Sequence, residues 1–346
     1  MKSISSSEIR ELFLKFFERN EHLIHPPSSL IPSNDPTLLL TNSGMAQFKN
    51  YFSGEAEPPK KRITSSQKCF RSTDIDEVGD STHLTLFEML GNFSFGDYFK
   101  EEACRLALEL MVKELNFDLN KIFITVHNDD PETEKIWIKL GIPKERIYFF
   151  GDTDNWWGPA GDEGPCGPCS ELHYYVGKEK IDSKINEGDP NWGPNIHEDF
   201  VELYNLVFTQ FYHHLNGKKT DLPNKNIDTG MGLERVATIL QGKNTVYQTD
   251  LFEKIIKKIE ENTNFIFGKP QEINKVSSDK AIAILAEHSR SATFLIADGV
   301  IPENVGRGYI LRRLIRKAMR YGFLLNLKEE FIIELSKEVI NLMGNY

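Results

Sequence analysis

Long apolar runs are missing from this chain of 346 residues. No stretch is long enough to span a bilayer, and the N-terminal residues MKSISSSEIRELF lack the apolar core of a signal peptide. Cysteine is also scarce, because four cysteines in a chain of this length do not suggest a disulfide framework. These absences argue against a membrane protein and a disulfide-rich secreted one, so we expect no membrane partner and a cytoplasmic protein.

Positive charge is in deficit as well. The formal net charge is -10, so the chain as a whole does not attract nucleic acid, and any basic surface must be local. Hydrophobic residues at 40% and charged residues at 27% are typical of an ordinary globular protein. The length favours roughly two domains with a large buried core.

Periodicity predicts helices and strands together in the larger, N-terminal part. Helical spacing occurs from a capping box at Ser5 to near Asn20, over Lys100–Leu115 and over Glu132–Leu140. Strands are expected over Thr37–Thr41, Ile63–Arg71, His83–Phe93, Ile122–Val126 and Val201–Phe211. Irregular structure is expected over Asp154–Ser170, a loop rich in glycine and proline, and over Val176–Asp199, a surface insertion.

The C-terminal part has helical spacing and no convincing strand. We therefore expect two domains, residues 1–245 and residues 246–346. A long apolar helix over Asp279–Ile296 is interrupted by His288 and Arg290.

A basic segment follows within Pro302–Tyr321. Its basic residues, which have no acid among them, are Arg307, Arg312, Arg313, Arg316, Lys317 and Arg320. On a helical wheel the residues from Arg312 to Arg320 share one face, and apolar residues lie opposite. Such a face is commonly just solvated, but in an acidic chain it also fits contact with a polyanion, and the segment alone leaves both open.

Ile227–Arg235 reads IDTGMGLER. Gly230 and Gly232 would allow a tight turn and the close approach of a ligand, with Asp228 at the end of a strand and Arg235 one turn into a helix. A plain glycine-rich turn has the same pattern. A dinucleotide fingerprint would need a third glycine where Arg235 stands, and a P-loop would need Gly-Lys-Ser/Thr, so neither fits.

The two strands at Ile63–Arg71 and His83–Phe93 would form a long hairpin around a polar loop. Arg71 at the end of the first could clamp a phosphate, and Phe87 in the second could stack a base. Each alone could equally be a surface arginine or a core phenylalanine. The segment Phe87–Lys100, FEMLGNFSFGDYFK, is nevertheless denser in aromatic residues and glycine than a simple edge hairpin.

Cys166 and Cys169 have the C-x-x-C spacing of a metal site. A tetrahedral zinc site usually needs a second pair, whereas Cys69 and Cys104 are isolated and His173 is a weak candidate. Structural thiols are favoured, and we assign no metal ligands.

Four stretches, in this order, carry a family resemblance. They are CFR at Cys69–Arg71 with FEMLGNFSFGDYFK at Phe87–Lys100, GPCGPCSE at Gly164–Glu171, IDTGMGLER at Ile227–Arg235, and RGYILRRLIRKA at Arg307–Ala318. Together they resemble the alanyl-tRNA synthetases, which are class II aminoacyl-tRNA synthetases, over essentially the whole chain. The resemblance implies an α+β fold, with a class II synthetase-type antiparallel sheet flanked by helices and followed by an incomplete helical tRNA-recognition region.

The implied activity is that of an ATP-dependent alanine–tRNA ligase. Such an enzyme activates L-alanine with ATP and Mg²⁺ to alanyl-adenylate, releases pyrophosphate, and transfers alanine to the 3′ end of tRNA(Ala), whose acceptor stem it binds.

The resemblance also implies roles for single residues. Catalytic roles fall to Arg71 at the α-phosphate, Arg235 at the terminal phosphates and Asp228 at the substrate ammonium. ATP binding is implied for Arg71, His83, Phe87 and Arg235. Alanine binding is implied for Trp157, Asn205, Val207, Asp228 and Gly230. tRNA binding is implied for Asn304, Arg307, Arg312, Arg313 and Arg316.

Some features depart from the family. The loop after Arg71, STDIDEVG, is shorter than in many members, and the resemblance does not assign the acids that would hold magnesium or the oligomeric state. The family's editing domain has no counterpart in these residues. Since an alanine pocket rejects glycine and serine only weakly, we expect that this chain alone does not clear mischarged tRNA. Efficient deacylation of seryl-tRNA by the purified chain would contradict this.

Two other functions remain compatible with the sequence. A paralogue could have kept the fold as an RNA-binding or regulatory module, although such a module has no need of the whole set Arg71, Phe87, Trp157, Asp228 and Arg235. An enzyme that activates alanine but charges tRNA poorly would have the same motifs.

Overall fold

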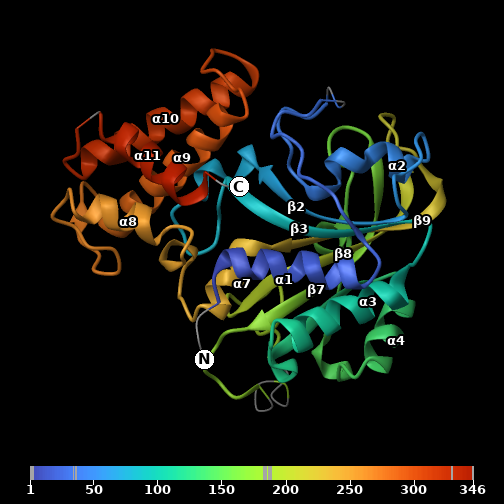
Figure 1. The fold of residues 1–346 in the computed structure, drawn as a ribbon. Helices are drawn as coiled ribbons and strands as arrows, with labels where there is room; N and C mark the ends of the chain where they lie inside the picture. Colours follow the sequence, from blue (N-terminus) through green and yellow to red (C-terminus); the bar gives the residue numbers. More distant parts are fainter. Residues whose placement is uncertain are drawn as a thin grey trace.

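The computed structural model describes residues 4–33, 35, 37–181, 185, 189–328 and 330–344. A large sheet lies at the centre with helices on both sides, and the helices of the C-terminal part pack as a group beside one end of it (Figure 1). The helices are α1 (Ser6–Arg19), α2 (Lys49–Ser53), α3 (Lys100–Glu109), α4 (Pro131–Lys139), α5 (Asp152–Asn155), α7 (Leu233–Leu240), α8 (Glu253–Glu260), α9 (Ser278–Ala297), α10 (Gly306–Leu324) and α11 (Phe331–Met343). The strands are β1 (Leu23–Ile24), β2 (Arg62–Phe70), β3 (Leu86–Phe95), β4 (Ile122–His127), β5 (Ile147–Phe150), β6 (Trp156–Trp157), β7 (Gly164–Tyr175), β8 (Phe200–His213), β9 (Lys219–Gly232), β10 (Glu272–Ile273) and β11 (Val276–Ser277).

The strand order of the large sheet is β1-β2-β3-β9-β8-β7-β4-β5, and β6 pairs with β7. All pairs from β2 to β4 are antiparallel, whereas the edge strands β1 and β5 pair in parallel with β2 and β4. The expected α+β fold with an antiparallel sheet flanked by helices is therefore confirmed, with two parallel pairs at its edges.

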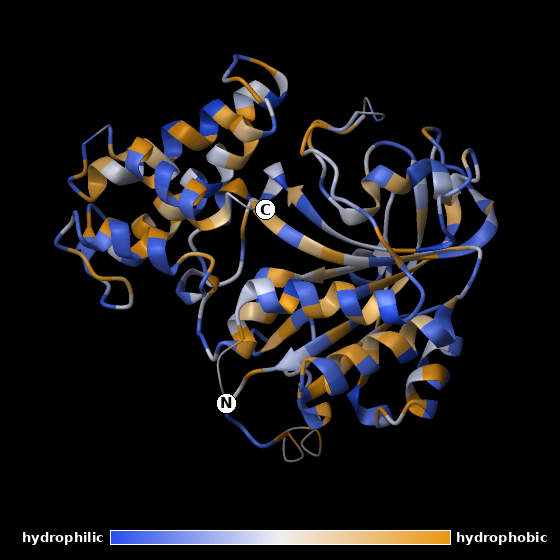
Figure 2. Cartoon of the chain, in the orientation of Figure 1, coloured by the Kyte–Doolittle hydropathy of each residue, from blue (hydrophilic) through white to orange (hydrophobic). Residues whose placement is uncertain are grey.

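Helices α1, α3, α4 and α7 pack against one face of the sheet and form the main core with it (Figure 1). The local sequence explains α1, because Ser5 and Glu8 form the predicted capping box. Ile9, Phe13 and Phe17 recur at helical spacing after it and are fully buried. Figure 2 shows the resulting mixture of hydrophobic and hydrophilic residues along α1 and the C-terminal helices.

The opposite face of the sheet carries a second core. Side chains alternate along a strand, so Leu90 of β3 enters the main core while Phe93 packs on the other side with Met45 and Phe48. Trp157 packs against the same cluster. The loop before β7 therefore lies on the face of the sheet that α1 does not cover.

The predicted strand at Thr37–Thr41 is wrong. No strand forms over the described residues 37–41, where Leu39 is 51% exposed, and the edge strand is instead Leu23–Ile24, paired with β2. A run of five apolar residues does not by itself distinguish a strand from a packed loop, which explains the error.

The predicted loop Asp154–Ser170 is only partly a loop, because β7 begins at Gly164. A register shift between Cys166 and Cys169 absorbs the glycine and proline there, as bulges do. A side chain at Gly167 would be excluded, since its Cβ would lie 2.1 Å from the carbonyl oxygen of Phe208.

The other predicted elements of the sheet part are confirmed: the hairpin of β2 and β3, the helices α1, α3 and α4, and the strands β4 and β8. The expected insertion Val176–Asp199 lies partly outside the described residues. In its described part, Trp192 packs against Phe123 and Phe200.

The C-terminal helices α8, α9 and α11 share a separate core, and α10 packs along α9. The predicted apolar helix is α9, and both of its polar interruptions, His288 and Arg290, are buried. The short hairpin of β10 and β11 was not predicted. Among the described helices, none has the length and apolar character that crossing a membrane requires.

Candidate active site

Two adjoining chambers lie on the face of the sheet opposite α1. One has a volume of about 90 Å³ and the other about 250 Å³. Their common wall consists of Arg71, Met89, Glu202 and Gly230, which line both. A ligand could therefore extend from one chamber into the other.

The smaller chamber contains the four residues that the resemblance assigns to ATP: Arg71, His83, Phe87 and Arg235. The antiparallel pairing of Cys69 with Phe87 brings Arg71 close to Phe87. The Arg71 guanidinium lies 5.0 Å from the centre of the Phe87 ring. Arg71 makes no hydrogen bond or ion pair through its side chain with any described residue. Its charge is thus available to an anionic ligand.

The other two residues of this chamber have partners. Arg235, at the start of α7, donates to the Glu202 carboxylate at 2.9 Å and to the Glu202 backbone carbonyl at 3.1 Å. His83 is hydrogen-bonded to Asp80 at 2.5 Å, and its side chain is 43% exposed. An anion in the chamber would compete with Glu202 for Arg235.

Glu202 was not predicted as a site residue. Burial raises the pKa of its carboxyl, but Arg235, His173 and Arg71 outweigh this and hold the pKa below its usual range. Glu202 is therefore ionised at neutral pH. The available signal was an acid inside the apolar strand VELYNLVF, which is unusual in a central strand.

The larger chamber contains the five residues that the resemblance assigns to alanine: Trp157, Asn205, Val207, Asp228 and Gly230. Strand register explains the meeting of four of them, because β8 pairs with β9 at Asn205↔Gly230 and Val207↔Asp228. Trp157 comes from β6, which pairs with β7 beside β8. The structure thus brings all nine predicted ATP and alanine residues to two adjoining chambers.

Asp228 has an unusual environment. Asp228 is 5% exposed, and burial raises the pKa of its carboxyl well above the usual range for an aspartate. No described residue forms a hydrogen bond or ion pair with its carboxylate. A buried charge without a partner is costly, so a cationic group bound in this chamber would be strongly favoured.

Two further polar atoms in the larger chamber lack partners among the described residues, Asn205 Oδ1 and Ser43 Oγ. The Asn205 amide nitrogen donates to Glu171 at 3.3 Å, which leaves its oxygen directed elsewhere. Ser43 was not predicted, since a serine before a turn carries no distinguishing pattern. The chamber therefore offers hydrogen-bonding atoms as well as a carboxylate.

The glycines of IDTGMGLER do not form the expected tight turn. Asp228, Gly230 and Gly232 all lie within β9, and α7 begins directly after it. Gly230 instead leaves room for Met89, because a Cβ at this position would lie 2.8 Å from Met89 Sδ in the wall between the chambers and the methionine side chain would have to shift.

The four cysteines are buried and unpaired. Burial raises the pKa of the Cys166 and Cys169 thiols, as expected for packing residues. Within the described ranges, no group of three or more histidine, cysteine, aspartate or glutamate side chains is placed to hold a metal ion.

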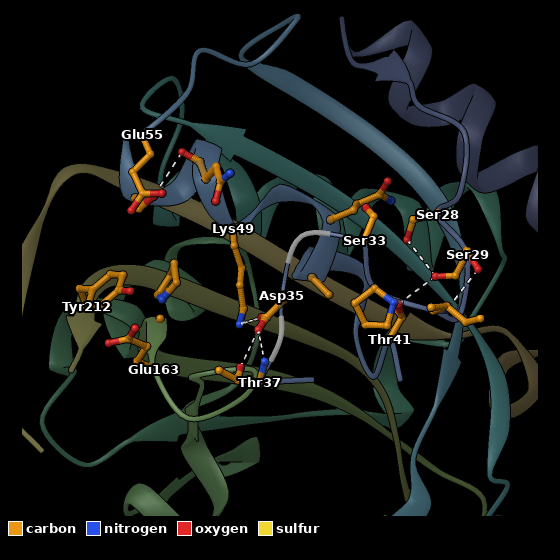
Figure 3. A pocket seen from close by; sticks show the side chains of 18 residues that line it. Ser28, Ser29, Ser33, Asp35, Thr37, Thr41, Lys49, Glu55, Glu163 and Tyr212 are labelled. Carbon is orange, nitrogen blue, oxygen red and sulfur yellow. Dashed lines mark hydrogen bonds and ion pairs between the residues drawn. The ribbon is translucent and has the colours of Figure 1, made fainter. Parts of the chain in front are cut away.

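A third cavity, of about 390 Å³, lies beside residues 28–55 (Figure 3). Lys49 and Asp35 form an ion pair at its wall, and Thr37 Oγ1 donates to Asp35 at 2.6 Å. Among the described residues, none lines both this cavity and either of the two chambers. It is separate from the candidate active site.

The basic residues of α10 are only partly free. Arg313 forms an ion pair with Asp76 at 2.7 Å, and Lys317 donates to the carbonyl of Ile75 at 2.5 Å, so both contact the loop after β2. Arg312 donates to Asn304. Exposed guanidinium groups remain at Arg316 and Arg320, and Arg307 is half-buried.

A family model described as tRNA synthetases class II (A) matches residues 8–346, and the chain belongs to this family. The alanine–tRNA ligase of Dehalococcoides mccartyi is 49% identical over 341 residues, and that of Petrotoga mobilis is 48% identical over 346 residues. The alanine–tRNA ligase of Leptospira borgpetersenii is 46% identical over 362 residues. These matches cover 98–99% of this chain but 38% of each relative, so the chain spans well under half of their length. The predicted resemblance to alanyl-tRNA synthetases is confirmed.

Proposed function

We propose that this chain is a cytoplasmic ligase that activates L-alanine with ATP and transfers it to tRNA(Ala). The observation that carries the proposal is the unpaired, buried carboxylate of Asp228 in the larger chamber, which is also lined by Arg71 from the wall shared with the smaller chamber. The Asp228 carboxylate suits an amino-acid ammonium group, and the Arg71 guanidinium suits a phosphate. The alanine–tRNA ligases described above, which match along nearly the whole chain, support the same substrates.

In the larger chamber, Asp228 binds the ammonium group of alanine, and Asn205 supplies hydrogen bonds. Trp157 and Val207 limit the room for the side chain, while the absence of a side chain at Gly230 lets the backbone border the ligand. The alanine carboxylate then lies towards Arg71 in the shared wall.

In the smaller chamber, Phe87 stacks on the adenine, Arg71 contacts the α-phosphate, and Arg235 with His83 contacts the terminal phosphates. An alanine carboxylate oxygen attacks the α-phosphorus, and the bond to pyrophosphate breaks with its electron pair on the leaving group. This reaction depends on alignment and neutralisation of charge rather than on a general base. Arg235 exchanges Glu202 for phosphate when ATP binds.

The residues present fit a magnesium ion. Magnesium is commonly held by one or two carboxylates together with phosphate oxygens and water. Glu202 lines both chambers and is ionised, whereas Glu171 already accepts hydrogen bonds from Thr125, His173 and Asn205. Glu202 would therefore hold the ion, which supplies positive charge to the terminal phosphates.

In the second step, a hydroxyl of the terminal ribose of tRNA attacks the carbonyl carbon of alanyl-adenylate, and AMP leaves. We assign this chemistry to a catalytic domain of residues 1–245 and acceptor-stem recognition to residues 246–346. The proposed RNA contacts are Asn304, Arg307, Arg312, Arg313 and Arg316. Because the minor groove of an RNA helix is shallow, these side chains could reach the base pairs of the stem.

The test is alanine-dependent exchange between ATP and pyrophosphate, run beside charging of a short acceptor-stem RNA. Exchange with charging is the expected result. Exchange without charging would favour an enzyme that activates alanine but needs more of the recognition region. No exchange from a folded, magnesium-supplied sample with any small amino acid would favour an RNA-binding module instead.

Replacing Arg307 and Arg316 by alanine is expected to raise the KM for acceptor-stem RNA about tenfold, because each is proposed to neutralise a phosphate. The slope of log KM against log salt should fall by about one per lost contact. Exchange should not change. The matched control is alanine at Arg105 and Lys113, exposed basic residues of α3 and of the π-helical segment Leu110–Glu114 that continues it. An equal loss in both double variants would contradict the proposed RNA contacts.

A further inference from the structure

The first residues of β3 extend past the end of their neighbour in the sheet. Pairing between β3 and β9 begins at Met89↔Gly232, because the chain leaves the sheet after Gly232 and forms α7. The backbone groups of Leu86 and Glu88 that face this side have no strand partner. Buried backbone polar groups must find other partners, and side chains provide them here.

Two of these side chains come from α9, in the C-terminal part. Glu287 accepts hydrogen bonds from the backbone N–H groups of Thr85 at 2.6 Å and Leu86 at 3.2 Å. Arg290 donates to the carbonyl oxygen of Leu86 at 3.1 Å. The residue directly before Phe87 is therefore held on both its N–H and its carbonyl by a helix that is distant in the sequence.

The third side chain comes from α7. Glu234 accepts a hydrogen bond from the backbone N–H of Glu88 at 3.1 Å, so the residue after Phe87 is held as well. Arg290 donates to Glu234 at 2.7 Å. Because Glu234 directly precedes Arg235, Arg290 connects the strand that carries Phe87 to the helix turn that carries Arg235.

This network is fully buried and consists of ionisable side chains. Glu234, Glu287 and Arg290 are at most 2% exposed, and the Arg290 guanidinium lies 5.0 Å from the centre of the Phe252 ring. Burial would raise the pKa of Glu287, but hydrogen bonds from His288 and Thr85 lower it to about 2, so Glu287 is ionised. Removal of one partner from a buried pair of this kind leaves the other uncompensated.

We propose that Arg290 is a positioning residue that fixes Phe87 relative to Arg235 for ATP binding. Glu287 assists by accepting hydrogen bonds from the backbone N–H groups of Thr85 and Leu86, directly before Phe87. The helix α9 thus sets the separation between the group that stacks on adenine and the group that contacts the terminal phosphates. None of the three network side chains enters the larger chamber, so alanine binding is independent of them. The proposal rests on the function proposed above.

The test uses the full chain in the exchange reaction with Arg290→Lys. Lysine keeps the buried charge but carries all its donors on one nitrogen, so it lacks the planar fork whose two nitrogens reach the Leu86 carbonyl and Glu234 separately. The expected result is a rise of about tenfold in KM for ATP, with KM for alanine unchanged. Thr85→Val is a milder second variant, since it removes only the hydroxyl that donates to Glu287 at 2.6 Å, and a rise of a few-fold is expected.

The control is Lys100→Met, which breaks another buried ion pair, to Asp130 at 2.6 Å, between α3 and the start of α4. It should lower Tm and leave KM for ATP unchanged, which separates positioning from general loss of stability. The proposal would be overturned if the wild type catalyses exchange and both Arg290→Lys and Thr85→Val have the same KM for ATP as the wild type. Equal rises in KM for ATP and alanine would do the same. Absence of exchange in the wild type would instead contradict the proposed function itself.

Discussion

Arg71→Ala is expected to lower kcat of alanine-dependent exchange about 10³-fold. The guanidinium has no competing partner among the described residues and lies at the wall shared by the two chambers, where the alanine carboxylate and the α-phosphate would meet. Negative charge on the α-phosphoryl oxygens must be neutralised as the new bond forms, and loss of one preorganised donor costs about 10²–10³ in rate. Loss of a full charge places the expected effect at the upper end of that range.

The matched control is Arg62→Ala. Arg62 lies at the other end of β2, forms ion pairs with Asp97 and Glu102, and lines neither chamber. Its loss should lower Tm while kcat stays within about twofold for the folded fraction. If Arg71→Ala retained more than about a tenth of the wild-type kcat at saturating ATP and alanine, the α-phosphate role would be wrong.

The site could be predicted from the sequence wherever a motif coincides with a strand pair. Asn205 and Val207 face Gly230 and Asp228 because β8 and β9 are adjacent and antiparallel, and a strand over Val201–Phe211 was expected from the sequence. The family resemblance supplied the candidate residues, and the strand pairing explains why the structure brings four of the alanine residues together.

Residues outside such motifs could not be assigned in the same way. Glu202 stood out only as an acid in an apolar strand, and Ser43 not at all. Arg290 was visible as a polar interruption of an apolar helix, but its partner Glu234 lies 56 residues earlier in the chain. No local pattern predicts which buried backbone groups such a side chain satisfies, because the open edge of β3 exists only once β9 has turned into α7.

Asp228→Asn is expected to lower kcat/KM for alanine about 10²-fold and to leave KM for ATP unchanged. The carboxylate is the one proposed partner of the substrate ammonium in a buried chamber, and loss of one member of such a pair costs about 3 kcal/mol, or about two orders of magnitude. Exchange measured at varied alanine gives the ratio. The matched control is Asp221→Asn, an exposed aspartate of the same strand, which should behave as the wild type.

The same substitution should stabilise the unliganded protein at neutral pH. Burial raises the folded-state pKa of Asp228, so ionisation is disfavoured in the folded state, and stability falls as the pH rises from the unfolded pKa of about 4 through the folded one. Asparagine removes this loss, so the gain in Tm should be absent near pH 3 and largest at neutral pH.

For the wild type, KM for alanine should rise as the pH falls through the raised pKa of Asp228, because only the carboxylate binds ammonium. A pH-independent KM, or a less stable Asp228→Asn variant at neutral pH, would mean that Asp228 has a structural partner rather than a substrate.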